Sequence, residues 1–98
     1  MTGSQTDPVS VPAHVIAAAA VERVASSFFT LGAMGLTLGK AEDYERWQFL
    51  RFVAATLHCR RAVSLGAGHV HQLREILDGC ESTPDVEFLR SIQFAEGD

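Results

Sequence analysis

Five side chains in the second half of the chain are of types that bind metal ions or act as nucleophiles. Structural zinc sites combine two closely spaced pairs of Cys or His ligands. The two histidines at 69 and 71 are the nearest to such a pair, but residues two apart on a helix point about 200° away from each other. They cannot share a metal ion unless that segment is non-helical, so we expect no metal site and no cofactor. The residues weighed are His58, Cys59, His69, His71 and Cys80.

Catalytic motifs are the second possibility. The chain has no nucleophile elbow, no glycine-rich phosphate loop and no helix motif with paired carboxylates. His58 and Cys59 are adjacent, and adjacent helix positions diverge by about 100°, so adjacency does not make them a catalytic pair. We expect the protein not to be an enzyme.

The two cysteines and the first residues of the chain together indicate the cellular compartment. Residues 1–14 carry no positively charged stretch ahead of an apolar one, so they do not resemble a secretory signal. We expect a cytoplasmic protein in which Cys59 and Cys80 are reduced and mostly buried. A protein that responds to metal or redox state through these two thiols remains an alternative.

The elements that must position these residues are helical. Residues 13–39 carry only two charges, Glu22 and Arg23, so this segment needs a covering surface from its own chain or from another. Its longest charge-free run, 24–39, falls short of the roughly 20 apolar residues of a membrane span, so we expect a helix buried in protein. Its seam has alternating spacings of four and three, which keeps one side facing one neighbour. The seam consists of Ala17, Val21, Val24, Phe28, Leu31, Gly35 and Leu38, with Ile16, Ala20 and Phe29 beside it.

Helix signals divide the rest of the chain. Acidic residues near 42–45 and basic ones at 60–61 suit the two ends of a second long helix, closed by the glycines at 66 and 68. A short helix follows over 69–78, and Thr83 with Pro84 starts another that frays near Phe94. No stretch alternates with the period of a strand. The predicted fold class is all-α, with about four helices, two long and two short, in a single domain over 10–98 behind a mobile tail of residues 1–9.

Charge and composition limit the partners. The formal charge is −4, and residues 75–98 hold seven acids against Arg90 alone, so direct binding to nucleic acid is not expected. Yet 47% of the residues are hydrophobic, more than a body of 98 residues is expected to hide. We expect a helical homodimer or a complex with another protein. The predicted interface residues are Val21, Val24, Phe28, Phe29, Leu31, Leu38, Trp47 and Phe52.

The whole chain, from MTGSQTDPVSVPAH through SSFFTLGAMGLTLGKAEDYERWQFLRF to its acidic end, resembles the QslA-type quorum-sensing antiactivators of Pseudomonas in length, composition and layout. The resemblance implies a protein that binds a LuxR-type transcription regulator. It would cover the regulator's dimerisation surface through apolar helix contacts and so prevent DNA binding. The resemblance assigns no role to any individual residue. The alternative function is a structural or chaperone-like helical subunit of a larger bacterial assembly.

Overall fold

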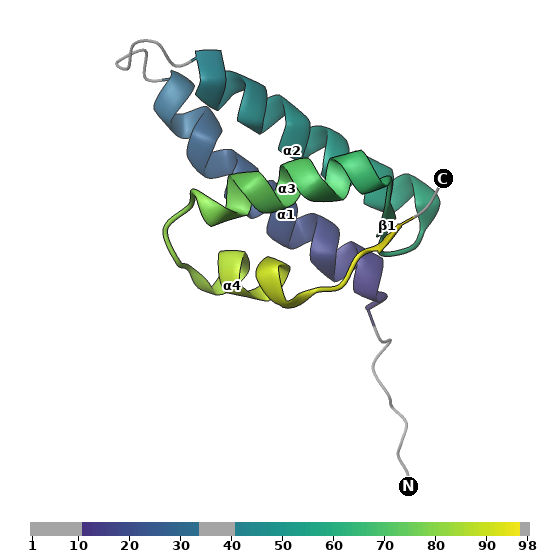
Figure 1. Ribbon diagram of the computed structural model, residues 1–98. Helices are drawn as coiled ribbons and strands as arrows, with labels where there is room; N and C mark the ends of the chain where they lie inside the picture. Colours follow the sequence, from purple (N-terminus) through teal and green to yellow (C-terminus); the bar gives the residue numbers. More distant parts are fainter. Residues whose placement is uncertain (1–10, 34–40, 97–98) are drawn as a thin grey trace, which may run out of the picture.

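The computed structural model describes residues 11–33 and 41–96, and helices dominate this part of the chain (Figure 1). The four predicted helices are confirmed. The structure also contains a small parallel sheet of two strands, which the sequence did not predict. The elements are α1 (Ala13–Ala33), α2 (Ala41–Arg60), β1 (Ser64–Leu65), α3 (Ala67–Asp78), α4 (Pro84–Ser91) and β2 (Ala95–Glu96). The predicted tail of residues 1–9 lies outside the described residues.

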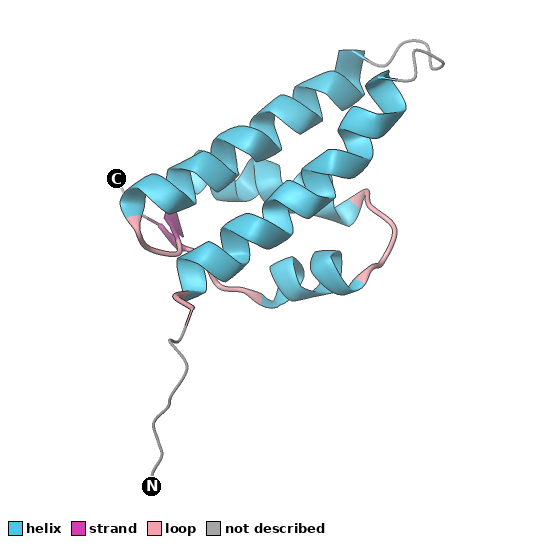
Figure 2. Cartoon of the chain, turned by 180° about the vertical axis from the view of Figure 1, so that it is seen from behind, coloured by secondary structure: helices cyan, strands magenta, loops and turns pink. Residues whose placement is uncertain are grey.

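Helices α1 and α2 lie side by side as an antiparallel pair, and α3 and α4 pack across this pair (Figures 1 and 2). Helix α1 begins after Pro12, whose carbonyl oxygen accepts hydrogen bonds from the amides of Val15 and Ile16. Alanine is the best helix former and leaves room for neighbouring helices to approach closely. Over residues 13–28 of α1, where side chains are described, the fully buried residues are Ala17, Ala18, Ala20, Val21 and Ala25.

This burial changes the expectation for the first apolar segment. Over residues 17–25 the chain covers its own apolar side chains, so a second polypeptide is not needed there. Ile16, predicted to flank the buried seam, is instead 44% exposed, whereas Ala20 is buried as expected. Gly35 and Leu38, the last two positions of the predicted seam, lie outside the described residues.

Helix α2 has the predicted distribution of charge, with Glu42 and Asp43 in its first turn and His58 and Arg60 in its last. Its inner side is fully buried and consists of Leu50, Val53, Ala54 and Leu57. The predicted end near the glycines at 66 and 68 is wrong. The helix stops at Arg60 because Arg61 adopts a left-handed backbone conformation, with φ of 55°.

The turn at Arg61 sends the chain into the sheet. Strand β1 pairs in parallel with β2, with Ser64 opposite Ala95 and Leu65 opposite Glu96. The amide of Ala95 also donates to the carbonyl oxygen of Val63 over 2.9 Å. Strands of two residues are too short to show an alternating pattern, which is why the sequence did not predict them.

Helices α3 and α4 complete the core. Gly66, expected to close α2, is instead the N-cap of α3, which buries Val70, Leu73 and Leu77. Helix α4 begins as predicted, since the Thr83 hydroxyl oxygen accepts a hydrogen bond from the Val86 amide over 3.2 Å. It ends at Ser91, before the predicted Phe94, which packs into the core at 7% exposure.

Neither of the two long helices meets the length and hydropathy needed to cross a bilayer, as judged over the described residues.

Candidate protein-binding site

A groove of about 480 Å³ lies between α1 and the segment that leads from α3 into α4. Its apolar wall combines Val24 and Phe28 of α1 with Val86 of α4. Val24 and Val86 are themselves held in the core, at 7% and 3% exposure, so this wall is fixed by packing. The lining residues are Arg23, Val24, Ser27, Phe28, Gly79, Cys80, Glu81, Thr83, Asp85 and Val86.

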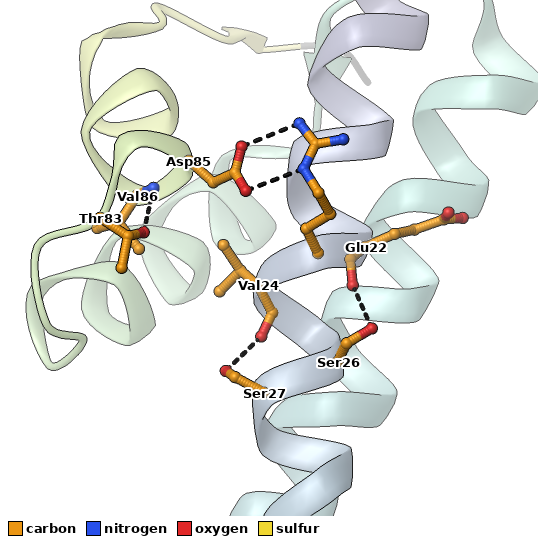
Figure 3. Close-up of polar contacts among 8 residues, drawn as sticks. Glu22, Val24, Ser26, Ser27, Thr83, Asp85 and Val86 are labelled. Atoms are coloured by element: carbon orange, nitrogen blue, oxygen red, sulfur yellow. Dashed lines mark hydrogen bonds and ion pairs between the residues drawn. The ribbon is translucent and has the colours of Figure 1, made fainter.

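The two sides of the groove are tied together by an ion pair. Arg23 donates two hydrogen bonds of 2.9 Å to the Asp85 carboxylate, in a bidentate arrangement. These hydrogen bonds lower the pKa of Asp85 against the opposing effect of burial, and they raise the pKa of Arg23. Asp85 reaches from the first turn of α4 toward α1 above Val24 (Figure 3). The pair therefore links α4 to α1, although solvent screens an exposed pair of this kind.

The floor of the groove is fixed by the end of α3. Arg90 of α4 donates to the carbonyl oxygen of Leu77 over 2.7 Å, and the Cys80 thiol donates to that of Ile76 over 3.2 Å. Burial raises the pKa of the Cys80 thiol, against the opposing charges of Arg90 and Arg46. Cys80 is therefore a neutral thiol near pH 7 and a poor nucleophile.

The upper wall of the groove is linked to α2. The Arg46 guanidinium carbon lies 5.9 Å from the centre of the Phe28 ring, a cation–π arrangement. Asp43 holds this arginine through an ion pair of 2.9 Å. Phe28 is half-buried, with part of its ring available in the groove.

Two neighbouring serines show how sharply the groove is bounded. Both lie on one turn of α1, both are exposed, and both donate to a backbone carbonyl of the same helix, Ser26 to Glu22 and Ser27 to Val24. Figure 3 shows their side chains on different sides of the helix. Ser27 lines the groove and Ser26 does not.

A second surface lies on the solvent side of α2 and contains exposed aromatic rings. Tyr44 is 51% and Phe52 is 47% exposed. The Phe52 ring meets the edge of His69 with the ring centres 5.0 Å apart, and Phe49 lies 6.4 Å away. Aromatic rings at this exposure are frequent anchors of protein interfaces.

The predicted interface residues do not form one surface. The chain's own packing covers Val21 fully and leaves Val24 only 7% exposed, although Val24 still lines the groove. Phe28 lines the groove, Phe52 lies on the solvent side of α2, and Trp47 is half-buried beneath Arg51. The side chains of Phe29 and Leu31, and the whole of Leu38, lie outside the described residues.

The metal and thiol candidates are dispersed. No group of three potential ligands is gathered in the described ranges 11–33 and 41–96. His71 pairs with Glu75 over 3.2 Å, while His69 packs on the aromatic rings. Cys59 and Cys80 are both free thiols, but Cys59 is exposed, which corrects the expectation that both would be mostly buried.

The sequence pattern did not indicate the groove residues of α4 and of the segment before it. Arg23 and Asp85 are 62 positions apart, and no spacing rule links two charges at that distance. Thr83 was recognised as a helix cap, which gave no sign that it also borders a groove.

Comparisons with known proteins add no relative: no family model matches the chain, and no significant match is found among curated proteins or solved structures. The resemblance to QslA-type antiactivators therefore stays a prediction.

Proposed function

We propose that the protein is a regulatory binding module that sequesters a transcription regulator by inserting itself against the regulator's apolar dimerisation surface. The groove between α1 and α4 supports this proposal most directly. It combines an apolar wall of Val24, Phe28 and Val86 with a charged rim of Arg23 and Asp85.

The groove, at about 480 Å³, has room for a large side chain of a protein partner. Interface energy concentrates in a few large side chains that enter such hollows, ringed by polar groups that exclude water. An apolar side chain of the partner would lie on Phe28, and the Arg23–Asp85 pair would lie at the edge.

The mechanism requires only competition. A regulator that binds DNA as a dimer exposes its apolar dimerisation surface when it is a monomer. A protein that binds the monomer withdraws it from the dimerisation equilibrium by mass action. The LuxR-type regulators are the partner class to test first, because the resemblance of the sequence indicates them. No cofactor enters this scheme.

The experiment mixes the full-length protein with a purified LuxR-type regulator and measures both complex formation and retention of the regulator's DNA in a gel-shift assay. We expect a stoichiometric complex and loss of the shifted DNA band. Ser27→Arg places a long side chain in the groove and should weaken the complex by roughly tenfold or more, as expected for a blocked anchor site.

Ser26→Arg is the matched control, because Ser26 shares the helix turn, the exposure and the type of hydrogen bond but lies outside the groove. Equal loss of binding in both variants would show that the groove is not the contact. A regulator that still binds its DNA in the presence of excess wild-type protein would exclude this regulator class as the target.

A further inference from the structure

The solvent side of α2 carries a line of exposed side chains, separate from the buried inner side of this helix. Its positions are spaced three, four, three and four residues apart, the spacing that keeps one line of side chains facing one neighbouring helix. Every member is exposed, so the described part of the fold leaves this line largely uncovered. We call this line the outer seam; it consists of Glu45, Gln48, Phe52, Ala55 and Cys59.

Phe52 is the central and largest side chain of the outer seam. It remains 47% exposed although Phe49 and His69 support it from one side. Ala55, one turn further along, is small and exposed, and it offers the hole that a large side chain of a facing helix needs. A small residue beside a large ring leaves room for a side chain of a facing helix.

The charges of α2 specify how a facing helix must run. Residues 42–46 carry the three acids Glu42, Asp43 and Glu45 against Arg46, which pairs with Glu42 and Asp43, so this end keeps a net negative charge. The other end carries His58 and Arg60, followed by Arg61. A parallel copy would place like charges opposite each other, which is destabilising. An antiparallel copy places the acidic start of one helix opposite the basic end of the other at both ends of the seam. The pattern is thus complementary to itself in one orientation only.

We propose that the outer seam is a homodimer interface in which α2 packs antiparallel against α2 of a second copy, with the two Phe52 rings near the centre. A two-fold axis makes each contact occur twice, so the exposed ring and the charge gradient of one copy meet the same features of the other. The inference does not rest on the proposed function. None of the residues that line the groove belongs to α2, so both grooves of the dimer stay open.

The first experiment measures the mass of the full chain by size-exclusion chromatography with light scattering, under reducing conditions and over a concentration series. We expect a species near twice the 10.6 kDa of one chain. Phe52→Asp should raise the dimer dissociation constant by roughly 30-fold or more, since it places two charges in the centre of the seam. Phe88→Asp is the matched control, because Phe88 is also an exposed phenylalanine, at 38%, but lies on α4; it should leave the dimer intact.

The orientation is tested by charge reversal. Glu45→Arg and Arg60→Glu should each weaken the dimer several-fold at low salt, and the double variant should recover the wild-type dissociation constant, because the charge gradient is simply inverted. Circular dichroism checks that each variant keeps its helix content. A wild-type protein that stays monomeric throughout the concentration series, or a Phe52→Asp protein that dimerises as the wild type does, would overturn the proposal. Two weakened single variants without recovery in the double would overturn the antiparallel arrangement.

Discussion

The groove between α1 and α4 and the outer seam of α2 are built in opposite ways. The groove is concave and draws on residues about 60 positions apart, so it exists only while α4 stays docked on α1. The outer seam is convex and belongs to one helix, so it persists wherever α2 is folded. Damage to tertiary docking should therefore affect the two surfaces unequally, which gives a way to separate their functions.

The largest expected effect comes from a core substitution that should damage the groove and spare the outer seam. Leu89 is fully buried and anchors α4. Leu89→Ala should lower the free energy of unfolding by about 2 to 5 kcal/mol, as cavity-forming substitutions do. Urea denaturation measures that loss. Under conditions where the variant is still folded, binding at the groove should weaken while the dimer mass is retained.

Ile16→Ala is the control for this substitution. Ile16 is an aliphatic residue that is 44% exposed, and it belongs neither to the groove lining nor to the outer seam. It should change the free energy of unfolding by no more than about 0.5 kcal/mol. A Leu89→Ala protein that loses the dimer as readily as it loses groove binding would show that the two surfaces are not independent.

A smaller effect is expected at the rim of the groove. Thr83→Ala removes the hydroxyl that caps α4 and should cost about 1 kcal/mol of stability. Thr83→Ser keeps the hydroxyl and should recover most of the loss. Hydrogen exchange would detect the change as faster exchange of the amides in the first turn of α4, with α2 unaffected. Equal acceleration in α2 would mean that the cap supports the whole fold and not only the groove.

The smallest effect is a dependence on pH. The folded-state pKa of Asp85 lies below its ordinary value of 3.8, chiefly because Arg23 donates hydrogen bonds to it. The pair therefore contributes stability above pH 3.8, and this contribution disappears as the pH falls through the lowered pKa. Asp85→Asn should be slightly less stable than the wild type at pH 6, and the difference should shrink on acidification and in high salt. Chemical denaturation at several pH values measures it; a difference that grows on acidification would contradict the assignment.

Features of the fold that depend on neighbouring residues could be predicted from the sequence, whereas features that depend on distant residues could not. The helices were predictable because their signals are local, such as Thr83 before Pro84, or the acidic start of α2. The end of α2 was not, because Arg61 adopts a conformation that glycine usually takes, while the glycine at 66 serves a different helix.

The candidate surfaces were predictable only in part. The periodicity of 17–28 indicated a buried side correctly, but it could not say whether α2, α4 or a partner covers Val21 and Val24. Phe52 was identified by its type, whereas the groove depends on how Arg23 and Asp85 meet across the fold. Such contacts become visible only when the helices are placed in space.

The chain contains a single tryptophan, and its position on α2 has a practical consequence. Trp47 lies 5.4 Å from the Tyr44 ring and beneath the Arg51 guanidinium, half-buried at the end of the helix pair away from β1. All intrinsic indole emission therefore originates from one known location. A spectral shift on adding a binding partner would report a change in the surroundings of that ring, without any attached dye.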